Sequence, residues 1–299
     1  MRIPLLLVEL KQINRKGLRW FFLMLMTTCM LSACEIINPS EPVPGYIRID
    51  SIAMNSQYST QGSSNSRYTD VWVSVNNNYL GTYELPVTLP VIADGSTKIS
   101  LRGGIMANGI AANRQAYPKA STYDTTFGMN PGKIHQMNPV ISYLPGTVFS
   151  QIEDFDDGSL SLVNTGNATA SLQITSQNDP NRFEGNSGFV TIDANQSLFE
   201  VASASAFPLP WNTEVFIELN YKCQTEFTVG MFITTSSTVF QYPLVNIRPT
   251  SEWKKIYINI SELQGIVSDG IAYKVYLRSD FNSSSTAGTI YLDNLKVLY

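Results

Sequence analysis

Histidine and cysteine are scarce in this chain of 299 residues, which contains one histidine and three cysteines. His135 has no second histidine to pair with, and no HExxH, CxxC or Gly-x-Ser-x-Gly pattern occurs. Hydrolases need an acid and a base, or an activated nucleophile, placed against one substrate atom. We therefore predict a non-catalytic protein, with His135 as a structural or surface residue.

Charged residues are also few, at 15% of the chain, and the formal net charge is -4. No basic cluster follows residue 19, which argues against nucleic acid as a partner and against electrostatic docking on anionic lipid. Serine, threonine, asparagine, glycine and tyrosine are abundant instead. This composition is typical of an exported β protein whose strands are half-buried.

The start of the chain places a basic segment, an apolar run and small residues in that order. The apolar run, Trp20–Met30, is about half the length of a membrane-spanning helix, so the order predicts a secretory signal over residues 1–33. Leu31-Ser32-Ala33-Cys34 resembles the bacterial lipobox, which implies cleavage before Cys34 and lipidation of its thiol, with palmitate among the acyl chains. A signal with an incidental cysteine and a membrane anchor are the alternatives.

Residues 34–45 hold three prolines, which keep a linker extended. With Cys29 in the leader and Cys34 lipidated, Cys223 is the thiol that is left, so no internal disulfide can form. Cys223 ends an alternating stretch, Phe216–Cys223, which predicts a small buried residue on a strand.

Short strands with frequent turn signals predict an antiparallel β-sandwich over residues 46–145. Val71–Val75 and Tyr79–Glu84 alternate, and the asparagines between them suit a tight hairpin. This hairpin, with Gly81, Pro86 and the Gly95 turn, resembles the small PEGA β domains and the surface-protein β modules of Bacteroidetes. No helical spacing of apolar residues extends over three turns here.

After the joint at Pro145-Gly146, residues 146–299 contain around ten strand candidates, a number typical of a jelly roll. Ile152–Gly158, Glu252–Ile260 and Tyr291–Val297 resemble the opening, central and closing motifs of galactose-binding-like jelly rolls, a group that includes many carbohydrate-binding modules and many plain assembly domains. The chain is therefore predicted to be all-β, with a small sandwich followed by a jelly-roll sandwich. Trp253 is expected in the core, as in those relatives.

That resemblance also implies a structural Ca²⁺ ion. In such jelly rolls an early acid and the aspartate of the closing motif often share the ion, so Glu153, Asp154 or Asp156 would meet Asp293. Clustered carboxylate oxygens suit Ca²⁺. The alternative is a solvated acidic turn, with Asp293 hydrogen-bonded to the backbone.

Aromatic side chains are the remaining candidates for ligand contact, because sugar sites stack flat rings on pyranose faces. Trp211 lies in a proline-rich loop, and Tyr242, Tyr273 and Tyr276 lie on or beside strands. The three tyrosines would line a concave face, and the indole of Trp211 would stay exposed in its loop. The alternative is that these rings pack in the core and at sheet edges.

These observations predict a non-catalytic lipoprotein of the outer membrane, on its periplasmic or cell-surface face, held by lipid on Cys34. Its jelly roll would bind a glycan at the cell envelope. The alternative is a structural or accessory subunit of a surface or secretion assembly. That role would require an exposed apolar patch near Pro145-Gly146.

Overall fold

A computed structural model of the chain describes residues 15–31, 41–92, 95–281 and 287–299. It contains two compact units, residues 1–44 and residues 45–299. In the first, α1 (Arg15–Leu31) carries exposed apolar side chains from Leu18 to Met26. None of the helices in the described part of the chain is both long and apolar enough to cross a bilayer. Cys34 lies outside the described residues, so its lipidation stays a prediction.

The second unit begins with a small sandwich. Its helix is α3 (Tyr58–Gln61), and its strands are β1 (Gly45–Ile49), β2 (Ala53–Asn55), β3 (Asp70–Val75), β4 (Asn78–Glu84), β5 (Val87–Val91), β6 (Gly95–Met106), β7 (Arg114–Ala116), β8 (Tyr123–Met129), β9 (Ile134–Met137) and β10 (Val140–Ser142). One sheet has the order β5-β1-β9 and another the order β4-β3-β6-β7, with β8 paired to β6. Side chains alternate between the two faces of each strand, and those that point inward, such as Ile47, Val71 and Leu101, fill the core of the small sandwich.

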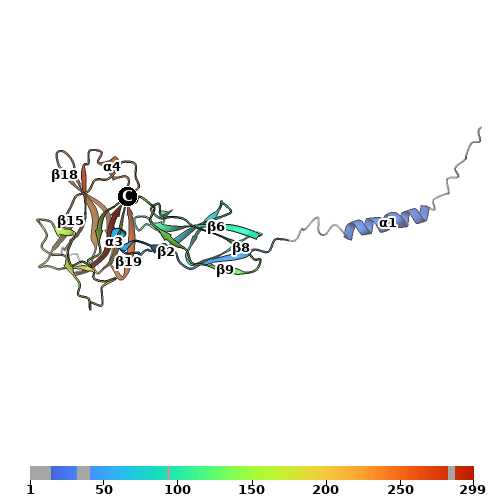
Figure 1. The fold of residues 1–299 in the computed structure, drawn as a ribbon, viewed down its shortest axis with the longest axis horizontal. Helices are drawn as coiled ribbons and strands as arrows, with labels where there is room; N and C mark the ends of the chain where they lie inside the picture. The colour runs from blue at the N-terminus through green and yellow to red at the C-terminus, as the bar shows by residue number, and fades with distance from the viewer. Residues whose placement is uncertain (1–14, 32–40, 93–94, 282–286) are drawn as a thin grey trace, which may run out of the picture. The chain divides into compact units, whose positions relative to one another are not determined.

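The chain continues into a larger sandwich (Figure 1). Its helix is α4 (Leu263–Ile266), and its strands are β11 (Phe149–Glu153), β12 (Leu162–Asn164), β13 (Gln173–Ile174), β14 (Gly188–Ile192), β15 (Leu198–Ser203), β16 (Phe216–Cys223), β17 (Phe227–Thr234), β18 (Val239–Ile247), β19 (Thr250–Asn259), β20 (Ala272–Asp280) and β21 (Gly288–Leu298).

Two antiparallel sheets form this sandwich. The first, here the β16 sheet, has the order β13-β14-β21-β16-β19, with β11 also paired to β21, and the second, the β17 sheet, has the order β12-β15-β20-β17-β18. Their facing residues, among them Ile217, Val229 and Leu292, make one core. The predicted all-β class, with a jelly roll following a small sandwich, is confirmed.

Pro145 and Gly146 lie in the turn between β10 and β11, and the residues on both sides belong to the same compact unit. The core of the small sandwich includes Phe216, Tyr257 and Leu298, which are outward-facing residues of the β16 sheet. The small sandwich therefore covers part of that sheet's outer face. The predicted domain limits stay predictions.

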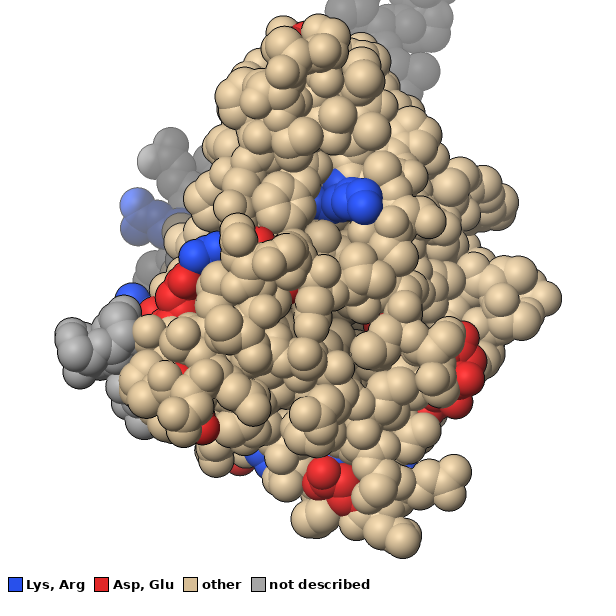
Figure 2. Space-filling view, turned by 90° about the vertical axis from the view of Figure 1, so that its left-hand side faces the viewer, with Lys and Arg blue, Asp and Glu red and all other residues tan. Residues whose placement is uncertain are grey.

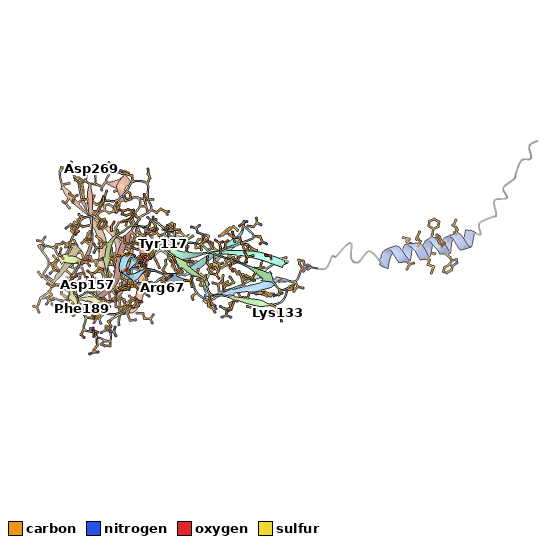
Figure 3. The ribbon with its side chains drawn as sticks, viewed as in Figure 1. Arg67, Tyr117, Lys133, Asp157, Phe189 and Asp269 are labelled. Atoms are coloured by element: carbon orange, nitrogen blue, oxygen red, sulfur yellow. The ribbon has the colours of Figure 1, made fainter. Side chains whose placement is uncertain are left out.

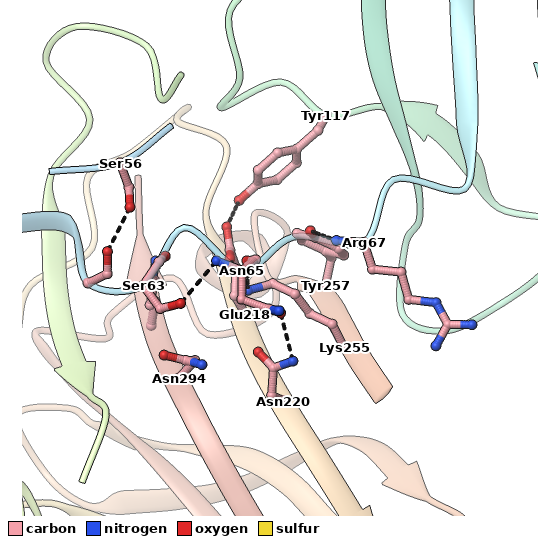
Figure 4. A network of polar contacts seen from close by, with 12 residues as sticks. Ser56, Ser63, Asn65, Arg67, Tyr117, Glu218, Asn220, Lys255, Tyr257 and Asn294 are labelled. Carbon is pink, nitrogen blue, oxygen red and sulfur yellow. Dashed lines mark hydrogen bonds and ion pairs between the residues drawn. The ribbon is translucent and has the colours of Figure 1, made fainter. Parts of the chain in front are cut away.

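A segment from Ser56 to Thr69, between β2 and β3, also lies on this outer face (Figure 4). The Asn220 side chain donates to Asn65 Oδ1 at 2.9 Å, and the Arg67 N–H donates to the Tyr257 hydroxyl at 3.0 Å. Figure 3 labels Arg67 and Tyr117 where the two sandwiches meet. The covered and uncovered parts of the β16 sheet thus lie next to each other on one face.

Candidate functional site

Four side chains form a row across the uncovered part of the β16 sheet. Phe189 on β14 pairs with Tyr291 on β21, which pairs with Lys222 on β16. Tyr221 pairs with Lys254, so Trp253 on β19 lies beside Lys222. We call Trp253, Lys222, Tyr291 and Phe189 the aromatic row. All four side chains are partly exposed.

The rings of the aromatic row make a nearly continuous surface. The Phe189 and Tyr291 ring centroids are 6.1 Å apart with 26° between the planes, and Trp253 and Tyr291 are 6.4 Å apart at 60°. The Lys222 ammonium lies over the Tyr291 ring, 5.9 Å from its centroid. Phe189 is labelled in Figure 3, well away from Tyr117 and the small sandwich.

Trp253 was expected in the core, and that expectation is wrong. The inward residues of β19 are Ile256 and Ile258, which belong to the core between the sheets. Side chains alternate along a strand, so Trp253 and Tyr257 share the opposite face with Lys255. The sequence contained this signal, because Trp253 is an odd number of positions from Ile256 and Ile258. If these two isoleucines face inward, Trp253 must face outward.

The loop between β13 and β14 fixes the row at one side. Trp253 Nε1 donates to the Asn181 carbonyl at 2.9 Å, and Lys222 Nζ donates to Asn181 Oδ1 at 3.0 Å. Phe183 of the same loop packs on the indole, with 5.0 Å between ring centroids. These contacts hold the indole in one orientation before any ligand arrives.

A hollow of about 540 Å³ borders the aromatic row at Lys222 and Tyr291. Besides Lys222 and Tyr291 its lining is mostly amide and hydroxyl side chains, including Asn181, Gln224 and Thr289. Gln224 Oε1 accepts the Thr289 N–H at 2.9 Å, which leaves its amide nitrogen as a donor toward the hollow. Aromatic surface beside a few fixed polar groups is the usual composition of a small-molecule site.

The next outward positions of β19 and β21, Lys255 and Asp293, are buried rather than open. Lys255 and Glu218 form an ion pair of 2.8 Å, with each side chain 1% exposed. Asp293 accepts the Ser187 hydroxyl at 2.7 Å, and burial raises the pKa of its carboxyl to about 7. The open face therefore ends at the aromatic row.

The predicted ligand residues do not form one face. Trp211 is 57% exposed in the loop before β16, and Tyr242 is partly exposed on β18, the edge strand of the β17 sheet. Tyr273 is 2% exposed and belongs to the core between the sheets. Tyr276 is also 2% exposed, on the opposite side of β20, where its ring lies against Gly230. Tyr273 and Tyr276 are three positions apart, and an odd spacing puts two residues on opposite faces of a strand.

The four predicted calcium ligands are hydrogen-bonded to protein groups, and Asp154 and Asp156 both interact with the Tyr58 hydroxyl. Glu153 accepts hydrogen bonds from Ser161, with 2.7 Å to its hydroxyl, whereas Asp156 accepts the Tyr58 hydroxyl at 3.0 Å. Asp154 accepts the N–H of Asp156 at 3.3 Å, and Asp293 accepts that of Asn294 at 2.7 Å. Among the described residues, no three acidic, histidine or cysteine side chains come together as a metal site. This donor set does not fit a Ca²⁺ ion.

The single histidine and the remaining cysteine have structural surroundings. His135 lies on β9, with its ring 4.8 Å from that of Phe127. Cys223 is 1% exposed in the core, as the alternation predicts, and burial is the main cause that raises the pKa of its thiol to about 11. A thiol that stays protonated is a poor nucleophile.

No family model and no curated protein sequence matches the chain. Among solved structures, carbohydrate-binding modules of the β-sandwich superfamily are similar over 78% of this chain and 86% of theirs, with 14% identity and a TM-score of 0.37. The family 11 carbohydrate-binding module of a Clostridium thermocellum cellulase is similar over 49% of this chain and 92% of its own, with 18% identity and a TM-score of 0.35. A tailspike domain of bacteriophage CBA120 is similar over 47% of this chain, at 11% identity and a TM-score of 0.33, and the chain spans 19% of that domain.

Proposed function

We propose that this protein binds a glycan, without catalysis, through the aromatic row on the β16 sheet. The observation that carries the proposal is the register that sets Trp253, Tyr291 and Phe189 in line across the sheet and partly exposed. Tyr291 also lines the polar hollow. A pyranose has an apolar face that can pack on such rings, and hydroxyls that need both donors and acceptors. The row offers both kinds of contact.

The proposal includes the location inferred from the leader. Lipid on Cys34 would hold the protein in the outer membrane, and the proline-rich residues 34–45 would space the body from the bilayer. Charge does not favour an anionic polymer, because the formal net charge of the chain is -4 and the face of the jelly roll seen in Figure 2 carries few Lys or Arg side chains. A neutral or weakly charged polysaccharide therefore suits the site best.

The test is a glycan array and a polysaccharide binding screen of residues 35–299, with and without Ca²⁺. Trp253→Ala should weaken saturable binding at least tenfold, because stacking on an aromatic platform is lost. Trp211→Ala is the matched control, since it removes an equally large ring from an exposed loop and should leave binding unchanged. Loss of binding in Trp211→Ala alone would move the site to that loop.

An assembly role is the second candidate, favoured by one observation. Leu144 and Val148, on either side of Pro145-Gly146, are both exposed apolar residues. Silence across the array, combined with co-purification of a second envelope protein with the lipidated chain, would favour this role over glycan binding.

A further inference from the structure

A second hollow, of about 440 Å³, lies where the edge strands β18 and β19 of the two jelly-roll sheets meet a loop of the small sandwich. The row residue Trp253 and the hollow residue Asn259 are six positions apart on β19, a span of about 20 Å at about 3.3 Å per residue. The hollow is therefore separate from the aromatic row. Both sandwiches contribute to its walls.

The loop of the small sandwich is held on the edge of β19 by backbone contacts. Ala107 forms a parallel bridge with Tyr257, and the Asn108 N–H donates to the Tyr257 carbonyl at 2.8 Å. Asn108 and Gly109 then turn the chain with φ angles of 58° and 68°. A Cβ on Gly109 would lie 3.3 Å from Ile256 Cδ1, so the turn approaches the strand closely. This fixed turn positions Asn108 and Asn113, the residues of the small sandwich that line the hollow.

The side chains of two asparagines at the hollow are oriented by hydrogen bonds that their Oδ1 atoms accept. Asn108 Oδ1 accepts the Asn259 N–H at 2.8 Å, and Asn259 Oδ1 accepts the Ser261 hydroxyl at 2.6 Å. These bonds fix the two amide planes, so that the Nδ2 donors of each side chain keep one orientation. Neither Nδ2 atom has a hydrogen-bond partner among the residues that the structure describes.

Four further polar groups line the same hollow without a hydrogen bond to a described side chain. They are the Glu214 and Glu262 carboxylates, the Asn113 amide and the Tyr242 hydroxyl. Lys119 is the cation near Glu214, and burial is the main cause that lowers the pKa of its amine. The floor is aliphatic, from Leu244 and other apolar residues. Fixed donors, carboxylate acceptors and an apolar floor are what a sugar ring with vicinal hydroxyls requires.

We propose that this hollow is a second saccharide site, which takes a single sugar unit against the aliphatic floor. Glu214 accepts from two neighbouring hydroxyls, and the Nδ2 atoms of Asn108 and Asn259 donate to ring or hydroxyl oxygens. The inference rests on the proposed function for its ligand class, but on different residues. Two sites on one body raise the affinity for a polymer above that for a short oligosaccharide.

The test is isothermal titration calorimetry of the full chain with hexasaccharides of β-1,4-linked glucose, mannose and galactose, used as three separate probes. A probe that binds should show two sites per chain. Glu214→Gln should remove one of them by weakening it at least tenfold, Trp253→Ala should remove the other, and the double variant should not bind. Glu226→Gln is the matched control, because it neutralises an exposed acid elsewhere on the jelly roll. Asn113→Ala gives a second variant that does not touch the backbone bridge.

The outcomes separate the two proposals. One site per chain, lost in Trp253→Ala and unchanged in Glu214→Gln and Asn113→Ala, would overturn the second site and support the aromatic row. One site lost in Glu214→Gln and unchanged in Trp253→Ala would overturn the aromatic row and support the hollow. No binding of any probe would overturn both.

Discussion

Glu218 lies at the centre of a buried polar network between the two sandwiches (Figure 4). Its carboxylate is 2.8 Å from Lys255 Nζ and accepts the hydroxyls of Tyr117 at 2.7 Å and Tyr143 at 3.0 Å. Lys296, 0% exposed, donates to the same Tyr143 hydroxyl at 3.2 Å. Burial alone would raise the pKa of Glu218, but the charges of Lys255 and Lys296, together with hydrogen bonds from Lys255 and Tyr117, hold that pKa below its usual value. The carboxylate is thus charged at neutral pH and balances two buried ammonium groups.

Glu218→Gln removes this charge while keeping the size of the side chain and an oxygen that can accept from Tyr117 and Tyr143. Breaking a buried ion pair by removing one partner costs about 3–5 kcal/mol, since the other charge is left uncompensated. Lys255 keeps a hydrogen bond to the Asn65 carbonyl at 2.9 Å, and Lys296 can release its proton. Both effects limit the loss, so we expect a fall of about 3 kcal/mol in the free energy of unfolding.

Glu200→Gln on the β17 sheet is the matched control. Glu200 is also buried and pairs with Arg278 at 2.6 Å, but Arg278 is 32% exposed and has a second partner in Asp280. The guanidinium therefore stays solvated and paired when Glu200 loses its charge, and the expected cost is about 1–2 kcal/mol. Urea unfolding at pH 7, followed by tryptophan fluorescence, measures both variants, with equal slopes required for the comparison. Equal destabilisation by Glu218→Gln and Glu200→Gln would refute the reasoning.

Two further outcomes are expected. The free energy of unfolding should rise by about 2 kcal/mol from pH 8 to pH 10. Burial is the main cause that lowers the pKa of Lys296 to about 8 in the folded protein. The folded protein therefore releases a proton that the unfolded lysine keeps until about pH 10.5. Lys296→Met should flatten this rise, and an unchanged pH profile in that variant would contradict the assignment. Above pH 10 the free energy of unfolding should fall again, because the pKa values of buried tyrosines such as Tyr117 and Tyr143 are raised in the folded protein. Cys34→Ala should release the protein from membranes or leave its leader attached, and a mature-size protein retained in the membrane fraction would exclude lipid anchoring.

Most of the strands could be predicted because their signal is local. The alternation in Phe216–Cys223 and the apolar parity of Ile256 and Ile258 are properties of neighbouring residues, and β16 and β19 follow them closely. The odd or even spacing of residues along a strand is therefore enough to separate Tyr273 from Tyr276 and to place Trp253 on the outer face.

The covering of the sheet could not be predicted in this way. Asn65 and Asn220, which lie 155 positions apart, meet only because the segment after β2 docks on the β16 sheet. The loop that starts at Ala107 likewise has no local pattern that directs it to β19. Such contacts depend on the relative placement of two sandwiches, which neither alternation nor turn chemistry encodes.

Two lysines show how that placement divides one face between two roles. Lys222 and Lys255 both project outward from neighbouring strands of the β16 sheet, in adjacent rows. Lys222 remains beside the open hollow, with its ammonium over the Tyr291 ring, whereas Lys255 is enclosed by the small sandwich and needs the Glu218 charge to offset its desolvation. The position of the small sandwich thus decides which lysine can meet a ligand, and it limits the proposed glycan contact to a row of three rings.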